Sequence, residues 1–338
     1  MKKRVFLFLL VLCLLLTFSA CSYEFDGDGG ASSYFSATCT VTFHPENGEE
    51  DIRRTVLSGE RVSSPADPVR DGNIFLGWFT DPTLTERYDF SAGVTHDLDL
   101  YASYLSDYAA WLNRLTLDFV PATVTVYTAS TKSGMFGFAD KTTSLKSGSG
   151  VIFYRNANYY YLLTNNHVVT KDADATGVSY EIEDYRGATY DATNQIQVVA
   201  SDPDYDLAVV SFAGPTGENA LSTVSLGTVD PALGSPLAAV GQPNGQKNAV
   251  TFGVAETYRV SDLHEESGIS SISFPVLFHT APISQGSSGG AVVDEDLKIV
   301  AINFAEASDG DGSFVYGLSV PISRVREFLT KYEVPTGE

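Results

Sequence analysis

The sequence is poor in basic residues and in cysteine. Lys and Arg together number 21 against 42 Asp and Glu, which gives a formal net charge of −21. A surface of this charge repels phosphate backbones, so nucleic-acid binding is excluded. Only three cysteines are present, too few for a disulfide scaffold of the kind that small secreted domains use.

Long stretches of Ala, Leu, Glu and Lys are also missing, whereas 29 Gly, 18 Tyr and many runs of Thr and Val are present. This composition favours strands and turns over helices. The chain has 338 residues, of which 43% are hydrophobic, and can therefore bury a sizeable core beside a second small domain. The predicted fold class is all-β.

The first twenty residues have the pattern of a secretory signal peptide. A basic start at residues 2–4 precedes the apolar run Val5–Leu16, which is too short for a stable membrane anchor. The next letters, FSAC at 18–21, resemble the lipobox of bacterial lipoproteins. The resemblance implies lipidation of Cys21 and anchoring to the cell membrane of a bacterium, on its extracytoplasmic side or cell surface. The alternative is an ordinary signal peptide cleaved after Ala20.

The remaining cysteines and the segment after the signal fit the lipoprotein interpretation. If Cys13 is removed and Cys21 is acylated, Cys39 is left alone, so we expect no intramolecular disulfide and an inward-facing Cys39 on a strand. Residues 21–37 are rich in Gly, Ser and Asp, which predicts a flexible tether. Their Asp-Gly run lacks the spacing of a calcium loop, so we expect no metal there.

A small module is predicted for residues 38–104. It contains VTF at 41–43, FLGW at 75–78, YDF at 88–90 and LYA at 100–102. These letters and their order resemble the internalin-type B repeat (Listeria-Bacteroides repeat) of bacterial surface proteins. The resemblance implies a β-grasp-like fold that serves as a spacer or binds a protein partner. Phe75, Trp78 and Tyr101 are interpreted as its core, with a ligand-binding platform as the alternative.

The rest of the chain is predicted to be a helical connector, a set of strands and a last helix. Residues 105–118 carry apolar side chains at helical spacing, as does Ile322–Lys331. Between them the strands are expected at Thr123–Thr128, Ser149–Tyr154, Tyr159–Thr164, Asp206–Phe212, Ala249–Tyr258, Pro275–His279, Lys298–Phe304 and Phe314–Val320. So many strands with Gly-rich turns indicate a sandwich or a pair of barrels over 119–334.

Three short stretches of this region carry residues suited to acyl transfer. They are TNNHV at 164–168, DYDLAV at 204–209 and GSSGG at 286–290. Each alone is explained by a strand end, a cap or a loop. Together they supply a hydroxyl, a base, an acid to orient the base, and a glycine-flanked turn whose amides can bind an oxyanion.

The three stretches and their order resemble the trypsin-like serine proteases, in particular the DegP and HtrA type. GSGV at 148–151 and VGQP at 240–243 also fit that group. The resemblance implies two six-stranded antiparallel barrels in a chymotrypsin-like arrangement. It also implies a catalytic triad of His167 and Asp206 from the first barrel and Ser288 from the second. The backbone amides of Gly286 and Ser288 would form the oxyanion hole, and no cofactor is required.

The same resemblance implies polypeptide substrates and an endopeptidase activity. It places a substrate pocket beside Ala281, Ile283, Ala301 and Asn303, which suits a small or medium apolar side chain. Glu306 and the loop at 308–313 are interpreted as a solvated turn, with recognition of a basic residue or binding of a cation as the alternative. Homotrimers occur among such proteases. We expect no PDZ-like domain after the protease. The alternative function is a surface adhesion or scaffolding lipoprotein whose protease fold is inactive or gated; a purely structural lipoprotein leaves the three motifs unexplained.

Overall fold

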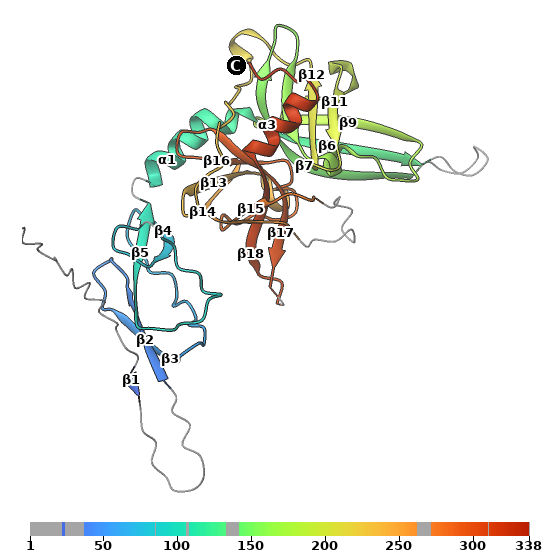
Figure 1. Ribbon diagram of the computed structural model, residues 1–338. Coiled ribbons are helices and arrows are strands. Elements are labelled where there is room, and N and C mark those ends of the chain that lie inside the picture. Colours follow the sequence, from blue (N-terminus) through green and yellow to red (C-terminus); the bar gives the residue numbers. More distant parts are fainter. Residues whose placement is uncertain are drawn as a thin grey trace, which may run out of the picture. The chain divides into compact units, whose positions relative to one another are not determined.

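Figure 1 shows the computed structural model of the chain, which describes residues 22–23, 37–84, 86–105, 108–132, 142–261, 272–309 and 311–337. The described residues form two compact units. One contains the residues up to Pro68 together with Trp78–Ser103, and the other contains Val69–Gly77 and the residues from Tyr104 onward. The predicted signal peptide, Cys21 and most of the tether lie outside the described residues.

The small unit is built around one central strand. Strand β2 (Ala37–His44) pairs antiparallel with β1 (Ser22–Tyr23) and β3 (Ile52–Leu57) and parallel with β5 (Leu98–Leu105), which in turn neighbours β4 (Ile74–Phe79). Alternate residues of β2, namely Cys39, Val41 and Phe43, are fully buried. The alternating sequence of this strand therefore has its apolar face turned inward.

Trp78 belongs to the core of this unit. It is 2% exposed, and its ring meets that of Phe43 edge to face at 4.9 Å. Tyr101 is half-buried and stacks on the His44 ring, and Phe75 is also half-buried. Core packing therefore accounts for Trp78, as the sequence suggested.

Cys39 corrects one expectation. It is fully buried, but it is disulfide-bonded rather than a free thiol. The other two cysteines of the sequence are Cys13 and Cys21, and both lie outside the described residues. The expectation treated residues 21–37 as a tether without strand pairing, whereas β1 pairs Ser22 with Thr38, the residue before Cys39.

The first half of the large unit is an open seven-stranded antiparallel sheet. Its strands, in spatial order, are β10 (Thr189–Tyr190), β9 (Gly177–Asp184), β6 (Thr123–Lys132), β7 (Thr142–Arg155), β8 (Tyr160–Thr164), β12 (Leu207–Phe212) and β11 (Gln197–Asp202). This differs from the expected closed six-stranded barrel, because β10 and β11 at the two edges are not paired with each other. All six residues of β12 are buried, as its unbroken apolar run requires.

The second half is a closed six-stranded barrel, as expected. The order of its strands is β13 (Pro236–Gly241), β14 (Ala249–Arg259), β15 (Val276–His279), β18 (Phe314–Pro321), β17 (Ile299–Ser308) and β16 (Ala291–Val293). The two halves together make a chymotrypsin-like fold with a C-terminal helix, which confirms the predicted fold class.

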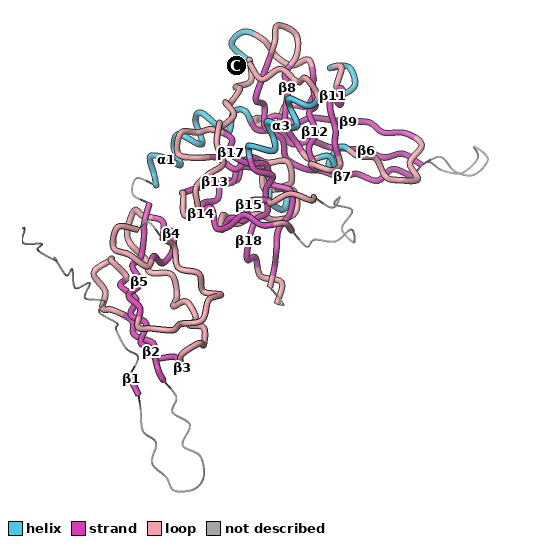
Figure 2. The backbone as a smooth tube through the Cα atoms, in the orientation of Figure 1, coloured by secondary structure: helices cyan, strands magenta, loops and turns pink. Residues whose placement is uncertain are grey.

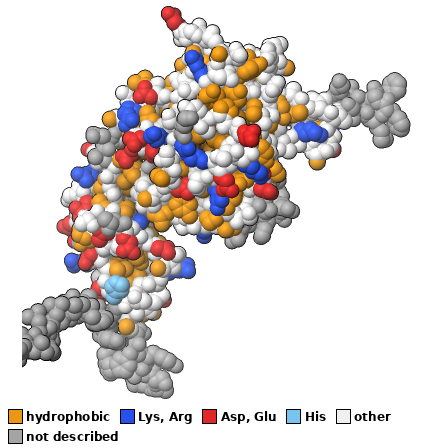
Figure 3. All heavy atoms as spheres, turned by 45° about the horizontal axis from the view of Figure 1, so that its top comes forward, with side chains coloured by type: hydrophobic (Ala, Val, Ile, Leu, Met, Phe, Trp, Pro, Cys, Tyr) orange, Lys and Arg blue, Asp and Glu red, His pale blue; other side chains and the backbone are white. Residues whose placement is uncertain are grey.

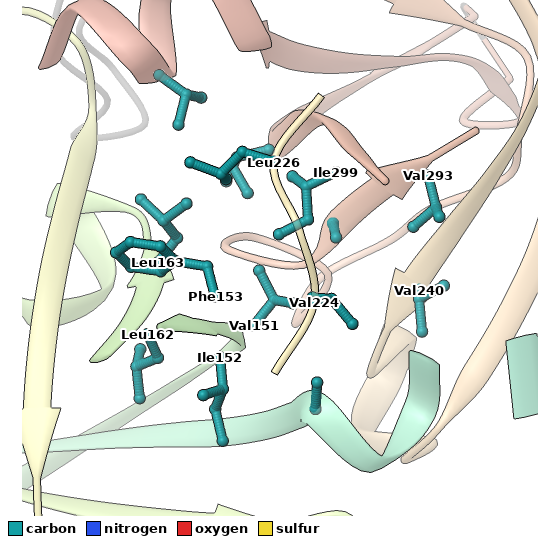
Figure 4. Close-up of a cluster of buried hydrophobic side chains, with 14 of the residues drawn as sticks. Val151, Ile152, Phe153, Leu162, Leu163, Val224, Leu226, Val240, Val293 and Ile299 are labelled. Carbon is teal, nitrogen blue, oxygen red and sulfur yellow. The ribbon is translucent and has the colours of Figure 1, made fainter. Parts of the chain in front are cut away.

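One continuous hydrophobic core joins the two halves. Figure 4 shows side chains of both halves directed toward the segment that carries Val224 and Leu226. Val151, Phe153 and Leu163 come from the open sheet, and Ile299 comes from the barrel. Close packing of this kind fixes the position of one half against the other, and a site between them inherits that rigidity.

Helices are few and short, as Figure 2 shows in cyan. They are α1 (Tyr108–Arg114), followed by a π-turn (Leu115–Phe119) and a 3₁₀ turn (Val120–Ala122), α2 (Asn166–Val169), α3 (Ile322–Lys331), and the 3₁₀ turns Ala192–Asn194, Gly217–Asn219 and Pro243–Gly245. Trp111 of α1 packs edge-on against Phe252 of the barrel. Helix α3 packs on β17 and β18. No helix in the described parts of the chain has the length and apolar character to cross a membrane.

Charged side chains of both signs lie on the face drawn in Figure 3. On the face drawn in Figure 3, Lys and Arg are interspersed with Asp and Glu despite the large negative net charge. Within the ranges that the structure describes, no three His, Cys, Asp or Glu side chains gather in a way that would hold a metal ion.

Candidate active site

His167 and Asp206 are brought together by the ends of two neighbouring strands. His167 lies on the short helix α2 after β8, and Asp206 immediately precedes β12, which pairs with β8. The His167 Nδ1 atom is 2.7 Å from Asp206 Oδ2, and the backbone N–H of His167 donates to Asp206 Oδ1 at 3.0 Å. The carboxylate therefore fixes both the ring and the backbone of the histidine.

Asp206 is held in an unusual backbone conformation. Its φ is +48°, which non-glycine residues rarely adopt, and its side chain is fully buried. The buried side chain of Asn165 donates from Nδ2 to the Asp206 carbonyl at 2.8 Å. Strain at one residue is retained only where its surroundings determine it, and here the result is a carboxylate aimed at His167.

Ser288 lies in the turn between β15 and β16. Its carbonyl accepts from Ser149 N–H at 2.7 Å, and the next amide, of Gly289, donates to Asn303 O at 2.8 Å. The Ser288 hydroxyl donates to the Phe304 carbonyl at 3.2 Å. The turn is thus bonded both to the open sheet and to the barrel, with the hydroxyl of Ser288 on the cleft side.

Two positions of this turn accept only glycine. Gly286 and Gly289 have φ of +97° and +85°. A Cβ on Gly286 would lie 2.5 Å from Gln242 O, and one on Gly289 would lie 2.1 Å from Ser149 O. Both the conformation and the close approach of the neighbouring backbone therefore require glycine.

The amides of Gly286 and Ser288 are open donors. Among the hydrogen bonds of the described residues, neither of these N–H groups donates to a protein acceptor. Both residues line the cleft, so their two unpaired amides can donate to an oxygen that carries negative charge.

The three candidate residues meet at one cleft of about 910 Å³. Both His167 and Ser288 line it, and Asp206 lies behind His167. The lining residues are Leu145, Lys146, Ser147, His167, Val168, Asn244, Gly245, Ile283–Ser288, Phe304, Ala305 and Glu306. A cleft of this size accommodates several residues of an extended peptide.

The predicted pocket residues are separated by the structure. Ile283 lines the cleft, whereas Ala281, Ala301 and Asn303 are fully buried and are absent from its lining. The wall next to Ser288 is formed instead by Phe304, Ala305 and Glu306 at the middle of β17. Burial raises the pKa of the Glu306 carboxyl.

Asn303 belongs to a buried polar group under the nucleophile turn. Its Oδ1 lies 2.9 Å from His279 Nε2 and accepts from the Ser319 hydroxyl at 2.8 Å. His279 is fully buried, and burial lowers its pKa to about 4 although the bond to Asn303 opposes that shift. His279 is therefore neutral at physiological pH.

Sequence reasoning gave no role to Ser149, Gln242 and Asn244. Ser149 donates from its hydroxyl to the Gly286 carbonyl at 2.8 Å, and Asn244 N–H donates to the Gln285 carbonyl at 2.7 Å. Gln242 N–H donates to the Ser149 hydroxyl at 3.0 Å. The only signal in the sequence was that GSGV and VGQP fit the pattern of the DegP and HtrA type.

Comparison with protein families agrees with this geometry. The profile of the trypsin-like peptidase domain matches residues 148–302, a range that includes all three candidate residues. The chain contains a trypsin-like peptidase domain. The profile of the Listeria-Bacteroides repeat domain matches residues 40–103, so the small unit is a repeat of that kind. The resemblances to the trypsin-like serine proteases and to the Listeria-Bacteroides repeat are confirmed.

Curated relatives of the peptidase domain are serine proteases. The chain is 30% identical over 247 residues to "Serine protease Do-like HtrA" of Bacillus subtilis (strain 168), covering 69% of this chain and 51% of the relative. It is 30% identical over 191 residues to "Periplasmic serine endoprotease DegP" of Escherichia coli (strain K12), covering 56% of this chain and 36% of the relative. The chain thus spans about half or less of these relatives.

Solved structures show the same fold. An HtrA-type protease solved with a decapeptide is 27% identical, with a TM-score of 0.51 over 66% of this chain and 67% of that one. The same type of protease solved with a tripeptide gives 27% identity and a TM-score of 0.50, over 68% of this chain and 64% of that one.

Proposed function

We propose that this protein is a serine endopeptidase that hydrolyses polypeptides through an acyl-enzyme. The observation that carries the proposal is the joint placement, in one cleft, of the Ser288 hydroxyl, a His167 ring held by Asp206 at 2.7 Å, and two open amides. The names of the curated relatives support the same reaction.

The first half of the reaction forms an ester on Ser288. The hydroxyl turns from the Phe304 carbonyl toward His167 Nε2, loses its proton to that nitrogen, and attacks the carbonyl carbon of the scissile peptide bond. Asp206 keeps the Nδ1 proton in place and stabilises the imidazolium that forms. His167 then gives its proton to the leaving amine, and the C–N bond breaks.

The second half releases the acid product. A water gives its proton to His167 and attacks the ester carbonyl, and the proton returns to Ser288 Oγ when the ester bond breaks. In both tetrahedral intermediates the amides of Gly286 and Ser288 donate to the oxyanion. Each such donor contributes about 10²–10³ to the rate in comparable enzymes.

The substrates that fit this cleft are extended segments of polypeptide. Besides Ser288, residues 145–147 of β7 and residues 304–306 of β17 line the cleft. Two structures of similar proteases were solved with a decapeptide and a tripeptide, which supports peptides as ligands of this kind of protein.

We further propose that the protein is a lipoprotein held at the outside of the cytoplasmic membrane or at the cell surface, through Cys21. Only the sequence at residues 1–21 supports this. Cys39 is disulfide-bonded, and Cys21 is a candidate for its partner. One sulfur cannot take part in both a thioether to lipid and a disulfide. Intact mass of the mature protein, with and without reduction, distinguishes acylated Cys21 from an oxidised pair.

Two interactions complete the proposal. The repeat at 40–103 binds a protein partner or serves as a spacer. The peptidase domains assemble into homotrimers. Light scattering of the purified protein measures its oligomeric state directly, and a monomer would contradict the proposed homotrimer.

The decisive experiment uses the full chain, purified in detergent, beside its Ser288→Ala variant. Both are treated with a fluorophosphonate probe and incubated with casein. We expect labelling and cleavage by the wild type and neither by the variant. A folded wild type that is not labelled would contradict the proposal and favour the alternative, a surface adhesion or scaffolding lipoprotein with an inactive or gated protease fold.

A further inference from the structure

The oxyanion site depends on the direction of one peptide plane. The N–H of Gly286 and the carbonyl of Gln285 belong to the same trans peptide, so they point in opposite directions. The Gln285 carbonyl accepts from Asn244 N–H at 2.7 Å. This bond turns the Gly286 N–H into the cleft, where it stays unpaired. Rotation of the plane would break the bond and place a carbonyl oxygen where the oxyanion must bind.

The next peptide plane is fixed by Ser149. The hydroxyl of Ser149 has one proton. It accepts from Gln242 N–H at 3.0 Å, and its proton therefore goes to the Gly286 carbonyl at 2.8 Å. Ser149 N–H also donates to the Ser288 carbonyl at 2.7 Å. One residue of β7 thus holds the carbonyls on both sides of the nucleophile turn.

Gln242 ties Ser149 to two strands of the open sheet. The Gly148 carbonyl of β7 only accepts, so it faces Gln242 Nε2, at 2.7 Å. The Oε1 atom then accepts from the Thr125 hydroxyl of β6, also at 2.7 Å. Thr125, Ser149 and Gln242 are each 5% exposed or less. We call the hydrogen bonds of Thr125, Gln242 and Ser149 the relay. All its polar atoms are paired, which is the condition under which a buried network makes a structure rigid.

We propose that Ser149 and Gln242 are positioning residues that hold the oxyanion hole open, and that the open sheet therefore sets the active state of the nucleophile turn. The inference rests on the proposed peptidase activity. Ser149 and Gln242 act through Gly286 and touch no reacting atom. Their loss should lower the rate of the chemical step and leave binding of the substrate unchanged.

The first test compares Ser149→Ala with Thr123→Val. Thr123 is a matched control, because its buried hydroxyl also donates to a backbone carbonyl at 2.8 Å, that of Val120, but does not contact the turn. We expect Ser149→Ala to lower kcat about 10- to 100-fold, less than or equal to the loss of an oxyanion donor, with KM changed less than about 3-fold. Thr123→Val should keep kcat within about 3-fold of wild type.

A peptide aldehyde separates positioning from general damage. Its adduct with Ser288 carries an oxyanion-like oxygen, so its affinity should fall by the same factor as kcat in Ser149→Ala. The affinity of a peptide substrate for the Ser288→Ala protein should not change when Ser149→Ala is added. An unchanged aldehyde affinity, or a kcat equal to that of Thr123→Val, would overturn the proposal.

Two further measurements keep the test decisive. If Ser149→Ala does not fold, Gln242→Met serves in its place, because it removes the side-chain bonds of Gln242 to Gly148 and Thr125. The fall in kcat should be smaller than that expected for Ser149→Ala, and the affinity for the aldehyde should fall by the same factor as kcat. Amide hydrogen exchange of residues 284–290 does not depend on turnover and should be at least 10-fold faster in Ser149→Ala than in wild type. An unlabelled wild type would defeat the peptidase proposal, whereas unchanged exchange would defeat the positioning proposal.

Discussion

Asp206 is bonded twice to His167, through the ring Nδ1 at 2.7 Å and through the backbone N–H at 3.0 Å. An Asp206→Asn substitution keeps an oxygen for the backbone bond, but the amide can donate to Nδ1 and so favours the wrong tautomer of the ring. In the proposed mechanism kcat should fall about 10⁴-fold with little change in KM, as in other triads of this kind.

Hydrolysis of a fluorogenic peptide by the wild type and by Asp206→Asn measures this fall in kcat. Asp204→Asn is the matched control, because Asp204 is an exposed neighbour in the same turn whose carboxylate does not contact His167. If Asp206→Asn retained more than a tenth of the wild-type kcat, His167 would not be acting as the general base.

A Gly286→Ala substitution should abolish activity without unfolding the protein. The new Cβ would lie 2.5 Å from Gln242 O, and the φ of +97° would strain any residue with a side chain. The turn must therefore shift, and the Gly286 N–H moves away from the oxyanion position. We expect fluorophosphonate labelling to slow at least 100-fold.

Gly217→Ala controls for the strain alone. Gly217 has a φ of +67° with open space around its position, so the substitution costs about 1 kcal/mol of stability and leaves labelling intact. Equal loss of labelling in the two variants would show that conformational strain, and not the geometry of the turn, causes the effect.

The fold class and the three candidate residues were predictable because their signals are local. A buried strand such as β12 is an unbroken apolar run, and the helix Ile322–Lys331 has its apolar residues on one face, so both were predicted nearly to the residue. Two of the strands that the sequence did not indicate have weak patterns. Only two of the eight residues of β9 are buried, and β16 has only three residues.

The features that sequence reasoning missed depend on side-chain direction and on long-range bonds. Asn303 was expected to face the substrate, but its side chain turns inward to His279 and Ser319. The hydroxyl of Ser149 meets a carbonyl 137 positions further along the chain. No local pattern indicates which of many Ser and Thr hydroxyls makes such a bond, so the relay appears only when both halves of the fold are in place.

Acid should destabilise the peptidase domain through His279. Burial lowers the pKa of this histidine to about 4, and in the unfolded chain it is near 6.5. Between these values the unfolded state binds the proton and the folded state does not, so stability falls as the pH falls from about 6.5 toward 4. The free energy of unfolding should drop by about 2 kcal/mol between pH 7.5 and pH 5 from this group alone.

Urea unfolding of wild type and His279→Gln at both pH values measures the contribution of His279. We expect the variant to be less stable at neutral pH, because the bond between His279 and Asn303 is lost, but its stability should change with pH by about 2 kcal/mol less than that of the wild type. Parallel pH dependences of the two proteins would contradict the prediction. Since Asn303 bonds to Gly289 and Gly290 through its backbone, activity should decline over the same range.

Glu306 should favour basic side chains in the substrate. Of the Lys, Arg, Asp and Glu side chains, Lys146 and Glu306 line the cleft, and Lys146 forms an ion pair with Asp172 at 3.0 Å. No ion pair of Glu306 occurs among the described residues, so its carboxylate is available to a Lys or Arg of the peptide. For a peptide with a basic residue before the scissile bond, Glu306→Gln should lower kcat/KM roughly 2- to 5-fold. A control peptide carries norleucine where the first peptide carries lysine. Glu306→Gln should hydrolyse this control peptide with the same kcat/KM as the wild type.

Salt separates this charge effect from a change in the shape of the cleft. The preference of the wild type for the lysine peptide should shrink when the ionic strength rises from 0.05 to about 0.5 M, and in Glu306→Gln it should be small at both concentrations. Glu218→Gln, which removes an exposed carboxylate on a 3₁₀ turn, serves as the control for net charge. An equal effect of both substitutions would mean that the overall negative charge attracts basic peptides. No effect of either would leave the apolar wall formed by Ile283 and Phe304 as the source of specificity.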